Sequence, residues 1–268
     1  MTSQQEKAAL LQRLHQGPRI LILPNCWDVG SALVIEKAGA SAVATSSAGI
    51  ANVLGYPDGQ EITRAEMIEM VRRVAAKVKL PVTADVEAGY GDAAETTRQV
   101  IKAGAVGMNL EDANKDGSLI ELEVQVASIR AARAAADKAE LAFVINARTD
   151  AFVAPGIADR PGEAVKRANA YLEAGASCAF VPFIADAAVI AQLAKQIKGP
   201  LNILFGVTSP SLADLEKMGV RRASLGSGPC RAAYARARDL TRELMTSGTC
   251  KSLEGAIPYA EMQAIFGK

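Results

Sequence analysis

Short apolar runs alternate with longer amphipathic segments along almost the whole chain. Runs rich in Val, Ile, Leu and Ala predict eight buried strands, at residues 20–23, 42–45, 82–84, 107–110, 142–146, 178–181, 201–204 and 222–225. The segments between them carry apolar residues at helical spacing and charges on the other face, as in residues 64–77, 93–103, 121–138 and 162–174. Strands that alternate with such helices predict βα units and a parallel sheet.

Glycine recurs where these helices are expected to end. Residues 37–40, 102–105, 173–176 and 217–220 each carry Gly at their third position, where it can adopt the left-handed conformation that closes a helix. A repeated helix, glycine and strand unit in 268 residues predicts one domain over residues 1–268, an α/β fold of the (β/α)₈ TIM-barrel type. Extra C-terminal helices are expected at residues 231–245 and 253–266, where they cap the barrel or pack on a neighbouring subunit.

A doubly wound open sheet is the alternative arrangement of such units. It requires a glycine-rich phosphate turn after an early strand, and the sequence has none there. Gly226-Ser227-Gly228 follows the last expected strand, and it is either a phosphate cup or a tight turn into the next helix.

Charge and composition narrow the classes of partner. Lys and Arg number 30 against 29 Asp and Glu, and the two signs are interspersed, so a nucleic-acid partner is not expected. Residues 1–17 are polar and helix-forming, and no later stretch approaches the ~20 apolar residues of a membrane span. We expect a cytoplasmic protein with a small-molecule substrate and no membrane partner.

Cysteine and histidine usage excludes several kinds of site. The four cysteines are scattered without a CxxC pair and are expected to be reduced thiols: Cys26, Cys178, Cys230 and Cys250. His15 is the only histidine, so one chain cannot assemble a histidine-based triad or a His-rich zinc site. We expect it to be a helix-surface or packing residue.

Polar residues gather where the expected strands end, which is where barrels carry their chemistry. Asp85 and Glu87 follow the third strand and Glu111 follows the fourth. Carboxylates held this close favour a hard divalent cation such as Mg²⁺, although they are alternatively salt-bridge partners of Arg148, which follows the fifth strand. Arg148 itself either grips a substrate carboxylate or serves as a structural counter-ion.

Small hydroxyl residues follow the second expected strand. Ser46 and Ser47 precede Ala48-Gly49, and their hydroxyls and backbone N–H groups predict a cradle for a substrate carboxylate. The alternative is a tight turn that only small residues permit.

Five ordered motifs carry a resemblance to a known family. They lie at residues 23–28, 46–49 with 55–59, 84–91, 109–112 and 146–150. Through them the chain resembles the isocitrate lyase and phosphoenolpyruvate mutase superfamily over nearly its whole length. The resemblance implies a barrel whose last helix swaps onto a neighbouring subunit, a homodimer or homotetramer, and a Mg²⁺ ion chelated by the substrate.

Site roles follow from the same resemblance. It implies that Asp85 binds the metal directly, and that Glu87 and Glu111 hold metal-bound waters. It also implies that Asp58 lies near the reacting centre and that Arg148 steadies the enolate oxygen or the leaving group. The substrate carboxylate is assigned to the run Ser46, Ser47 and Ala48.

The loop after the fourth strand separates the branches of the superfamily. The lyase branch carries a catalytic cysteine there, whereas residues 113–119 contain none. The phosphonopyruvate branch uses a gating loop that is only partly matched by Lys115 and Ser118, and its histidine after strand six is replaced by residues 181–183, Val-Pro-Phe. Lys115 and the mouth residues Asp58, Glu111 and Arg148 are the candidate catalytic set, and Asn202 on the seventh strand is a candidate substrate contact.

These observations predict a Mg²⁺-dependent lyase that makes or cleaves a C–C bond beside the carbonyl of a small α-oxo acid through a pyruvate enolate. C–P chemistry on a phosphonate substrate such as phosphonopyruvate, by a phosphonomutase or hydrolase, is the alternative reaction. A non-catalytic metabolite-binding barrel is the alternative from another class. Residues 114–118, Asn-Lys-Asp-Gly-Ser, are expected to form a mobile gate, or alternatively a plain exposed connection.

Overall fold

The structure is a computed structural model that describes residues 3–267. Its strands are β1 (Leu21–Leu23), β2 (Asn25–Cys26), β3 (Val43–Thr45), β4 (Val82–Asp85), β5 (Gly107–Glu111), β6 (Val144–Arg148), β7 (Cys178–Val181), β8 (Leu201–Leu204) and β9 (Arg222–Ser224). Every pairing between neighbouring strands is parallel, in the order β1-β9-β8-β7-β6-β5-β4-β3-β2. The expected α/β barrel is confirmed.

The barrel closes through Pro24. β1 and β2 form the two ends of the sheet order, yet Pro24 alone separates them in the chain. Proline has no N–H to donate, so the ladder is interrupted there, while Pro24 O still accepts a hydrogen bond from Ala44 N at 3.1 Å. The run expected at residues 20–23 is observed as β1, and β2 continues the same strand direction beyond Pro24.

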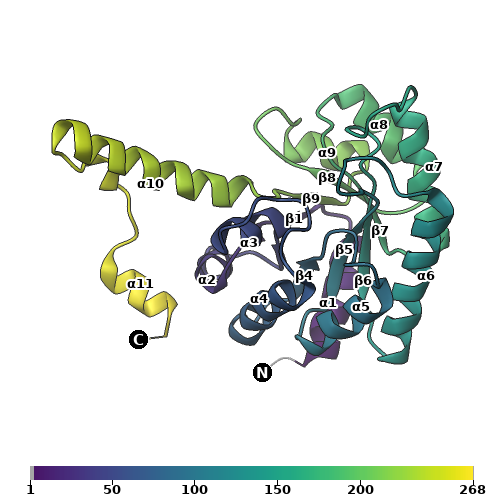
Figure 1. The fold of residues 1–268 in the computed structure, drawn as a ribbon, viewed down its shortest axis with the longest axis horizontal. Coiled ribbons are helices and arrows are strands. Elements are labelled where there is room, and N and C mark those ends of the chain that lie inside the picture. Colours follow the sequence, from purple (N-terminus) through teal and green to yellow (C-terminus); the bar gives the residue numbers. More distant parts are fainter. Residues whose placement is uncertain (1–2, 268) are drawn as a thin grey trace.

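Helices surround the strands (Figure 1). They are α1 (Gln4–Gln16), α2 (Val29–Lys37), α3 (Ser47–Val53), α4 (Arg64–Lys77), α5 (Ala93–Lys102), α6 (Leu122–Lys138), α7 (Arg160–Glu173), α8 (Ala187–Gln196), α9 (Leu212–Met218), α10 (Gly228–Ser247), the 3₁₀ turn η1 (Lys251–Leu253) and α11 (Tyr259–Ile265). Serine, threonine or aspartate side chains cap the starts of several of them, as Thr63 does with Glu66 at α4. None of the helices described in residues 3–267 is long and apolar enough to cross a membrane.

Side chains alternate between the inside of the barrel and the layer under the helices. On β5, Met108 and Leu110 are fully buried in the apolar cluster beneath the helices, so Asn109 points the other way. Asn109 accordingly lines the cavity inside the mouth. The same alternation turns polar residues of the other strands into the barrel. Those at the C-terminal ends of the strands reach the mouth.

Helix α1 lies across the N-terminal ends of the strands. Lys7 Nζ donates to Val78 O before β4 at 3.0 Å, and Gln4 Nε2 donates to Ala105 O before β5 at 3.0 Å. His15 is 2% exposed, so of its two expected positions the structure shows the packing residue.

The C-terminal segment differs from the expected pair of helices. α10 projects away from the barrel in Figure 1, and the chain then turns back towards α2. The helix expected over residues 253–266 is wrong as a continuous element, because Gly255 takes a φ of +80° and Pro258 immediately precedes α11. Only η1 and α11 form within that range.

Candidate active site

A polar cavity of about 310 Å³ lies at the C-terminal ends of the strands. Six of the predicted site residues line it: Ser46, Ser47, Ala48, Asp58, Asp85 and Arg148. They come from the ends of β4 and β6 and from the connection between β3 and β4, which the barrel brings together. The predicted convergence of these residues on one mouth is therefore observed.

Asp85 ends β4 with a carboxylate held on both oxygens. Oδ2 accepts hydrogen bonds from Ser47 N at 2.9 Å and Ser47 Oγ at 2.7 Å. Oδ1 has a single long contact, from Asn109 Nδ2 at 3.4 Å. The carboxylate is thus fixed in direction, with most of the acceptor capacity of Oδ1 left for a ligand in the cavity.

Arg148 ends β6 between two acids. Its guanidinium donates to both oxygens of Asp150 at 2.7 Å and pairs with Glu111 Oε2 at 2.8 Å. The rings of Phe180 and Phe183 lie 5.9 and 5.6 Å from its central carbon, within reach of a cation–π contact. Its orientation is set before any substrate arrives.

A buried acid, Asp112, fixes the backbone of Asp150. Asp112 is fully buried and accepts hydrogen bonds from Asp150 N at 2.9 Å and Tyr171 Oη at 2.6 Å. Arg167 Nη1 pairs with Oδ2, the oxygen that also accepts from Tyr171, at 3.2 Å. Asp112 therefore fixes the backbone that carries the partner of Arg148 and does not face the cavity.

The acids at the mouth resist ionisation. Burial raises the pKa of Glu111 to about 8, although Arg148 opposes the shift. Burial, followed by the charge of Asp85, raises the pKa of Asp58. Burial also raises the pKa of Glu87, against the opposing hydrogen bond from Gln60 N. Several carboxylates with raised pKa values in one small site need a cation or protons to coexist.

Glu87 is the clearest sign of a missing positive partner. Its backbone takes a φ of +52°, a left-handed conformation that is uncommon for a residue other than glycine and that turns its carboxylate. Oε1 accepts from Gln60 N at 2.9 Å. The buried Oε2 has no partner at normal hydrogen-bond geometry in the described part of the chain, and neither has the nearby buried hydroxyl of Tyr90, which lowers the pKa of Glu87. An unpaired buried carboxylate oxygen beside Asp85 fits a hydrated cation.

The donor set fits Mg²⁺ bound mostly through water. Within residues 3–267, no group of three or more His, Cys, Asp or Glu side chains is close enough to cage an ion directly. Mg²⁺ commonly keeps several waters and uses one or two carboxylates. Asp85 could supply the direct ligand, and Glu87 could hold a bound water through its unpaired oxygen.

Two donors remain open beside Ser47, next to Asp85. Ser46 Oγ accepts from Gly49 N at 3.2 Å and keeps its own proton for a ligand. Ala48 N, in the first turn of α3, has no acceptor in the described residues. Ser47 N–H and Oγ–H both donate to Asp85 in this structure, and its predicted contact with a substrate carboxylate stays a prediction.

Comparison with known proteins identifies the family. A model of the phosphoenolpyruvate phosphomutase family matches residues 11–245. The chain belongs to this family. The resemblance to the isocitrate lyase and phosphoenolpyruvate mutase superfamily is confirmed.

Relatives cover most of the chain. An uncharacterized protein of Mycobacterium tuberculosis is 34% identical over 251 residues, 93% of each chain. The 2-methylisocitrate lyase of Escherichia coli (strain K12) is 34% identical over 243 residues, 84% of this chain and 80% of that enzyme. A solved structure from Burkholderia cenocepacia J2315 is 34% identical, with a TM-score of 0.93, and covers 99% of this chain and 98% of its own.

Four predicted site residues do not line the cavity of this family member: the acids Glu87 and Glu111 described above, and Asn202 and Lys115. Asn202 is fully buried inside the barrel, where it exchanges hydrogen bonds with Ser224 at 3.2 and 3.3 Å. Lys115 is exposed and pairs with Glu61 at 3.5 Å. Asn202 faces the barrel interior below the mouth. Lys115 lies on the loop that joins Ala113 to Leu119.

That loop is ordered by internal hydrogen bonds. Asn114 N donates to Ser118 O at 2.8 Å, and Ser118 N and Oγ both donate to Asp116 Oδ1. Ala113 and Leu119 form an antiparallel bridge across its base. The predicted gate is a small hairpin beside the mouth, and its mobility stays a prediction.

Several residues that line the cavity were not predicted. They contribute amides, aromatic rings and a second cation: Asn25, Asn109, Phe180, Phe183 and Arg231. Asn25 Oδ1 accepts from Leu225 N and Gly226 N at 2.8 and 2.9 Å, which ties the last βα connection to the first. Gly226-Ser227-Gly228 forms a turn into α10, and Gly226 and Ser227 line the cavity, so a phosphate cup there stays a prediction.

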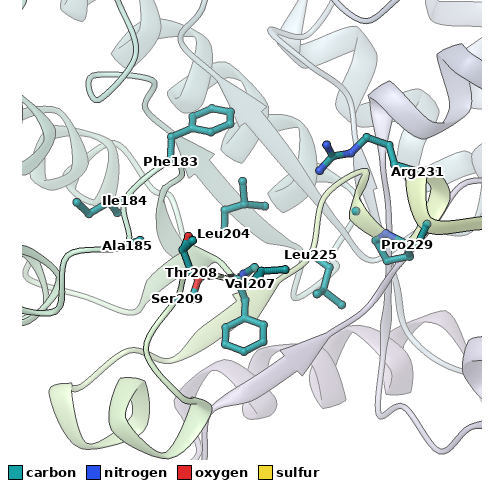
Figure 2. Close-up of a pocket in the computed structure, with 14 residues that line it drawn as sticks. Phe183, Ile184, Ala185, Leu204, Val207, Thr208, Ser209, Leu225, Pro229 and Arg231 are labelled. Atoms are coloured by element: carbon teal, nitrogen blue, oxygen red, sulfur yellow. Dashed lines mark hydrogen bonds between the residues drawn. The ribbon is translucent and has the colours of Figure 1, made fainter. Parts of the chain in front are cut away.

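An apolar groove adjoins the cavity on the side where α10 departs (Figure 2). Its volume is about 1010 Å³, and it shares Phe183, Leu204, Leu225 and Arg231 with the cavity. Figure 2 shows Val207, Thr208 and Pro229 around the same space. Val207 is fully exposed, so this side of the barrel is uncovered in a single chain.

Proposed function

We propose that the chain is a Mg²⁺-dependent enzyme that makes or cleaves a C–C bond beside the carbonyl of a small α-oxo acid. The observation that carries the proposal is the pair of fixed opposite charges in one small cavity, Asp85 and Arg148. When bound, Mg²⁺ would act as a Lewis acid that lowers the energy of negative charge on the substrate oxygens.

The chain's own groups would hold the substrate at both ends. Ser46 Oγ–H and Ala48 N–H are placed to donate to its carboxylate. The Arg148 guanidinium is placed to stabilise the enolate oxygen as charge develops, and it needs no reorganisation because Asp150 already orients it. Asp58, with its raised pKa, would exchange a proton at the enolate carbon C3.

The positions of the cysteines support a reaction in which no cysteine acts as the general acid. Cys26 and Cys178 are fully buried, and burial raises the pKa of each to about 12. Among the cysteines only Cys250 is exposed, and it lies beyond the end of α10. No thiol in the described chain lines the cavity, which favours decarboxylation or cleavage of an oxaloacetate-like substrate over cleavage by a cysteine acid.

Relatives with known ligands or activities support the substrate class. An oxaloacetate decarboxylase of Ectopseudomonas mendocina (strain ymp) is 33% identical over 211 residues, 74% of this chain and 70% of that enzyme. A phosphonopyruvate hydrolase solved with oxalate and Mg²⁺ is 26% identical, with a TM-score of 0.85. The second likeness keeps C–P cleavage of phosphonopyruvate as the alternative reaction of the same site.

A turnover assay separates these functions. Pyruvate release would be followed with oxaloacetate and with phosphonopyruvate, each with Mg²⁺ and with excess EDTA. We expect Mg²⁺-dependent release from oxaloacetate above the rate with metal alone. Release from phosphonopyruvate only would favour C–P chemistry, and binding of oxo acids without turnover of any would favour a non-catalytic metabolite-binding barrel.

We also propose that two chains exchange α10 in a homodimer, alone or within a tetramer. α10 leaves its own barrel, and the strand that it leaves behind is bare, because Ile22 of β1 is 48% exposed. Apolar residues of the C-terminal segment are equally open, among them Met245 and Tyr259. The groove at Pro229 is where a partner's helix would lie.

A further inference from the structure

Arg222 is a charged side chain buried in the interior of the barrel. It opens β9, is 0% exposed, and belongs to none of the ion pairs found in residues 3–267. Burial lowers the pKa of Arg222 to about 10, which still leaves it charged at neutral pH. A lone buried cation is costly, so its retention calls for a partner elsewhere in the interior.

Two neutral groups orient the guanidinium. Nη2 donates to Asn109 Oδ1 at 3.1 Å, and Nη1 lies 3.5 Å from His15 Nε2. His15 Nδ1 lies 2.8 Å from Leu11 O, which can only accept, so Nδ1 carries the proton and Nε2 is free to accept from Arg222. Burial lowers the pKa of His15 to about 4 and keeps it in this neutral form.

Arg222 also fixes the amide of Asn109. Oδ1 of Asn109 accepts from both Arg222 Nη2 and Asn146 Nδ2, the latter at 2.8 Å. Two donors on one side identify that atom as the oxygen and leave the NH₂ group on the other side. That NH₂ group faces Asp85 Oδ1 at 3.4 Å.

A continuous column therefore runs up the barrel from His15 through Arg222 and Asn109 to Asp85. Above Asn109 the site is rich in acids, and Arg148 is already shared by Glu111 and Asp150. Inside a protein, charges act over longer distances than in water. Arg222 is the one cation below the carboxylates in the described column.

We propose that Arg222 is a positioning residue that holds the carboxylate of Asp85 in its observed orientation through Asn109 and so strengthens Mg²⁺ binding. The proposal rests on the proposed function, in which Asp85 binds the metal. Arg222 touches neither metal nor substrate, and it acts from beneath as a fixed positive charge. Groups behind a metal ligand commonly change metal affinity by about 10- to 100-fold.

The test is calorimetric titration of Mg²⁺ into the full chain with saturating oxalate. We compare wild type with Arg222→Met, which removes the charge, Arg222→Gln, which keeps a donor for Asn109, and Arg222→Lys, which keeps the charge. Cys178→Ala is the control, because it leaves a hole in the same interior, and its thiol donates to a backbone oxygen and not to Arg222, Asn109 or Asp85.

We expect Mg²⁺ affinity to fall about 10-fold or more in Arg222→Met and Arg222→Gln, with partial rescue in Arg222→Lys. Cys178→Ala should lower Tm and leave Mg²⁺ affinity within about twofold, since Cys178 takes no part in the hydrogen bonds that link Arg222 to Asp85. If Arg222→Met does not fold, Arg222→Gln carries the test.

Wild-type affinity in a folded Arg222→Gln or Arg222→Met would overturn the role of Arg222 and leave the proposed function intact. An equal loss of affinity in Cys178→Ala would overturn it as well, because the effect would then be general disturbance of the interior. Absence of Mg²⁺ binding in wild type would refute the proposed function itself, and this inference with it.

Discussion

Arg148 depends on Asp150 for its direction. The carboxylate of Asp150 accepts from Nε and Nη2 of Arg148, and its own backbone is tied to Asp112. A paired geometry of this kind fixes the plane of the guanidinium as well as its position. The cation is thus aimed into the cavity by residues that themselves do not line it.

Loss of the hydrogen bonds between Arg148 and Asp150 should lower turnover. Asp150→Asn can accept only one of the two hydrogen bonds, so Arg148 is expected to turn towards Glu111 and kcat/KM to fall by at least about 10-fold. Steady-state kinetics on the best substrate would measure the change. Asp186→Asn, an exposed cap of α8, is the matched control and should keep wild-type kinetics; equal losses in both variants would contradict the assignment.

His15 should give folding stability a pH dependence of known sign. Its pKa is about 4 in the folded chain, because of burial and of Arg222, against 6.5 for a free side chain. Below 6.5 the unfolded chain binds a proton that the folded chain does not, so this contribution to stability is full above 6.5 and is lost as the pH falls towards 4. Between pH 7 and 5 the loss is about 2 kcal/mol.

Urea unfolding of wild type and His15→Gln at pH 7 and 5 would measure that contribution. Other groups titrate in both proteins, so the quantity of interest is the difference between the two pH dependences. The variant should lose less stability than wild type over this interval. Identical losses would show that His15 is not held neutral by its surroundings.

Only some of the residues in the cavity and beneath it could be predicted from the sequence. Asp85, Asp58 and Arg148 were predictable because charges at strand ends in a barrel meet at one mouth. Asn109 and Arg222 were not singled out, because Asn109 carries no charge and Arg222 stands in an Arg-Arg pair that resembles a surface sequence. Only the strand register turns Arg222 into the barrel.

The observed ends of helices and strands match the predicted ones where apolar residues are regularly spaced. They differ where a single proline, glycine or polar pair ends or interrupts the element. The strand expected at residues 142–146 is observed at Val144–Arg148, because pairing with β5 continues up to the polar pair Glu111 and Arg148. Pro24 divides the first strand, and Gly255 with Pro258 interrupts the last expected helix. The number and order of βα units were unaffected by these local breaks.

The hairpin at residues 114–118 is the element whose function is most open to test. Lys115 links it to Glu61, three residues beyond Asp58, so two connections that border the mouth are joined by one exposed ion pair. Exposed pairs contribute little, and the two segments can separate readily. A segment held in this way can open and close over the cavity.

Replacement of residues 114–118 by a Gly/Ser linker of equal length should lower kcat at least about 10-fold, or ~1.4 kcal/mol of barrier, because water then reaches the enolate. Mg²⁺ affinity should remain that of wild type. Mg²⁺ affinity is the control for an intact site, and kcat decides whether the hairpin closes over the substrate. Unchanged turnover would leave a plain exposed connection as the correct interpretation.

At the scale of the whole molecule, the bare side of the barrel predicts self-association. Multi-angle light scattering should give a mass of twice or four times the 28.0 kDa chain. Ile22→Glu places a charge on the exposed β1 residue that a partner's helix would cover, and should shift the protein towards monomer. Val124→Glu, on the exposed face of α6, is the control and should not; a monomeric wild type would refute the exchange of α10.

The central claim is that Asp85 recruits Mg²⁺ to bind an α-oxo acid opposite Arg148. Calorimetric titration of oxalate, a mimic of enolpyruvate, tests it directly in wild type and Asp85→Ala, each with Mg²⁺ and with EDTA. We expect tight binding only in wild type with Mg²⁺, while Asp85→Ala stays folded because its side chain faces the mouth rather than the packed layers. Equal oxalate affinity in the folded variant, or in wild type without Mg²⁺, would contradict the account.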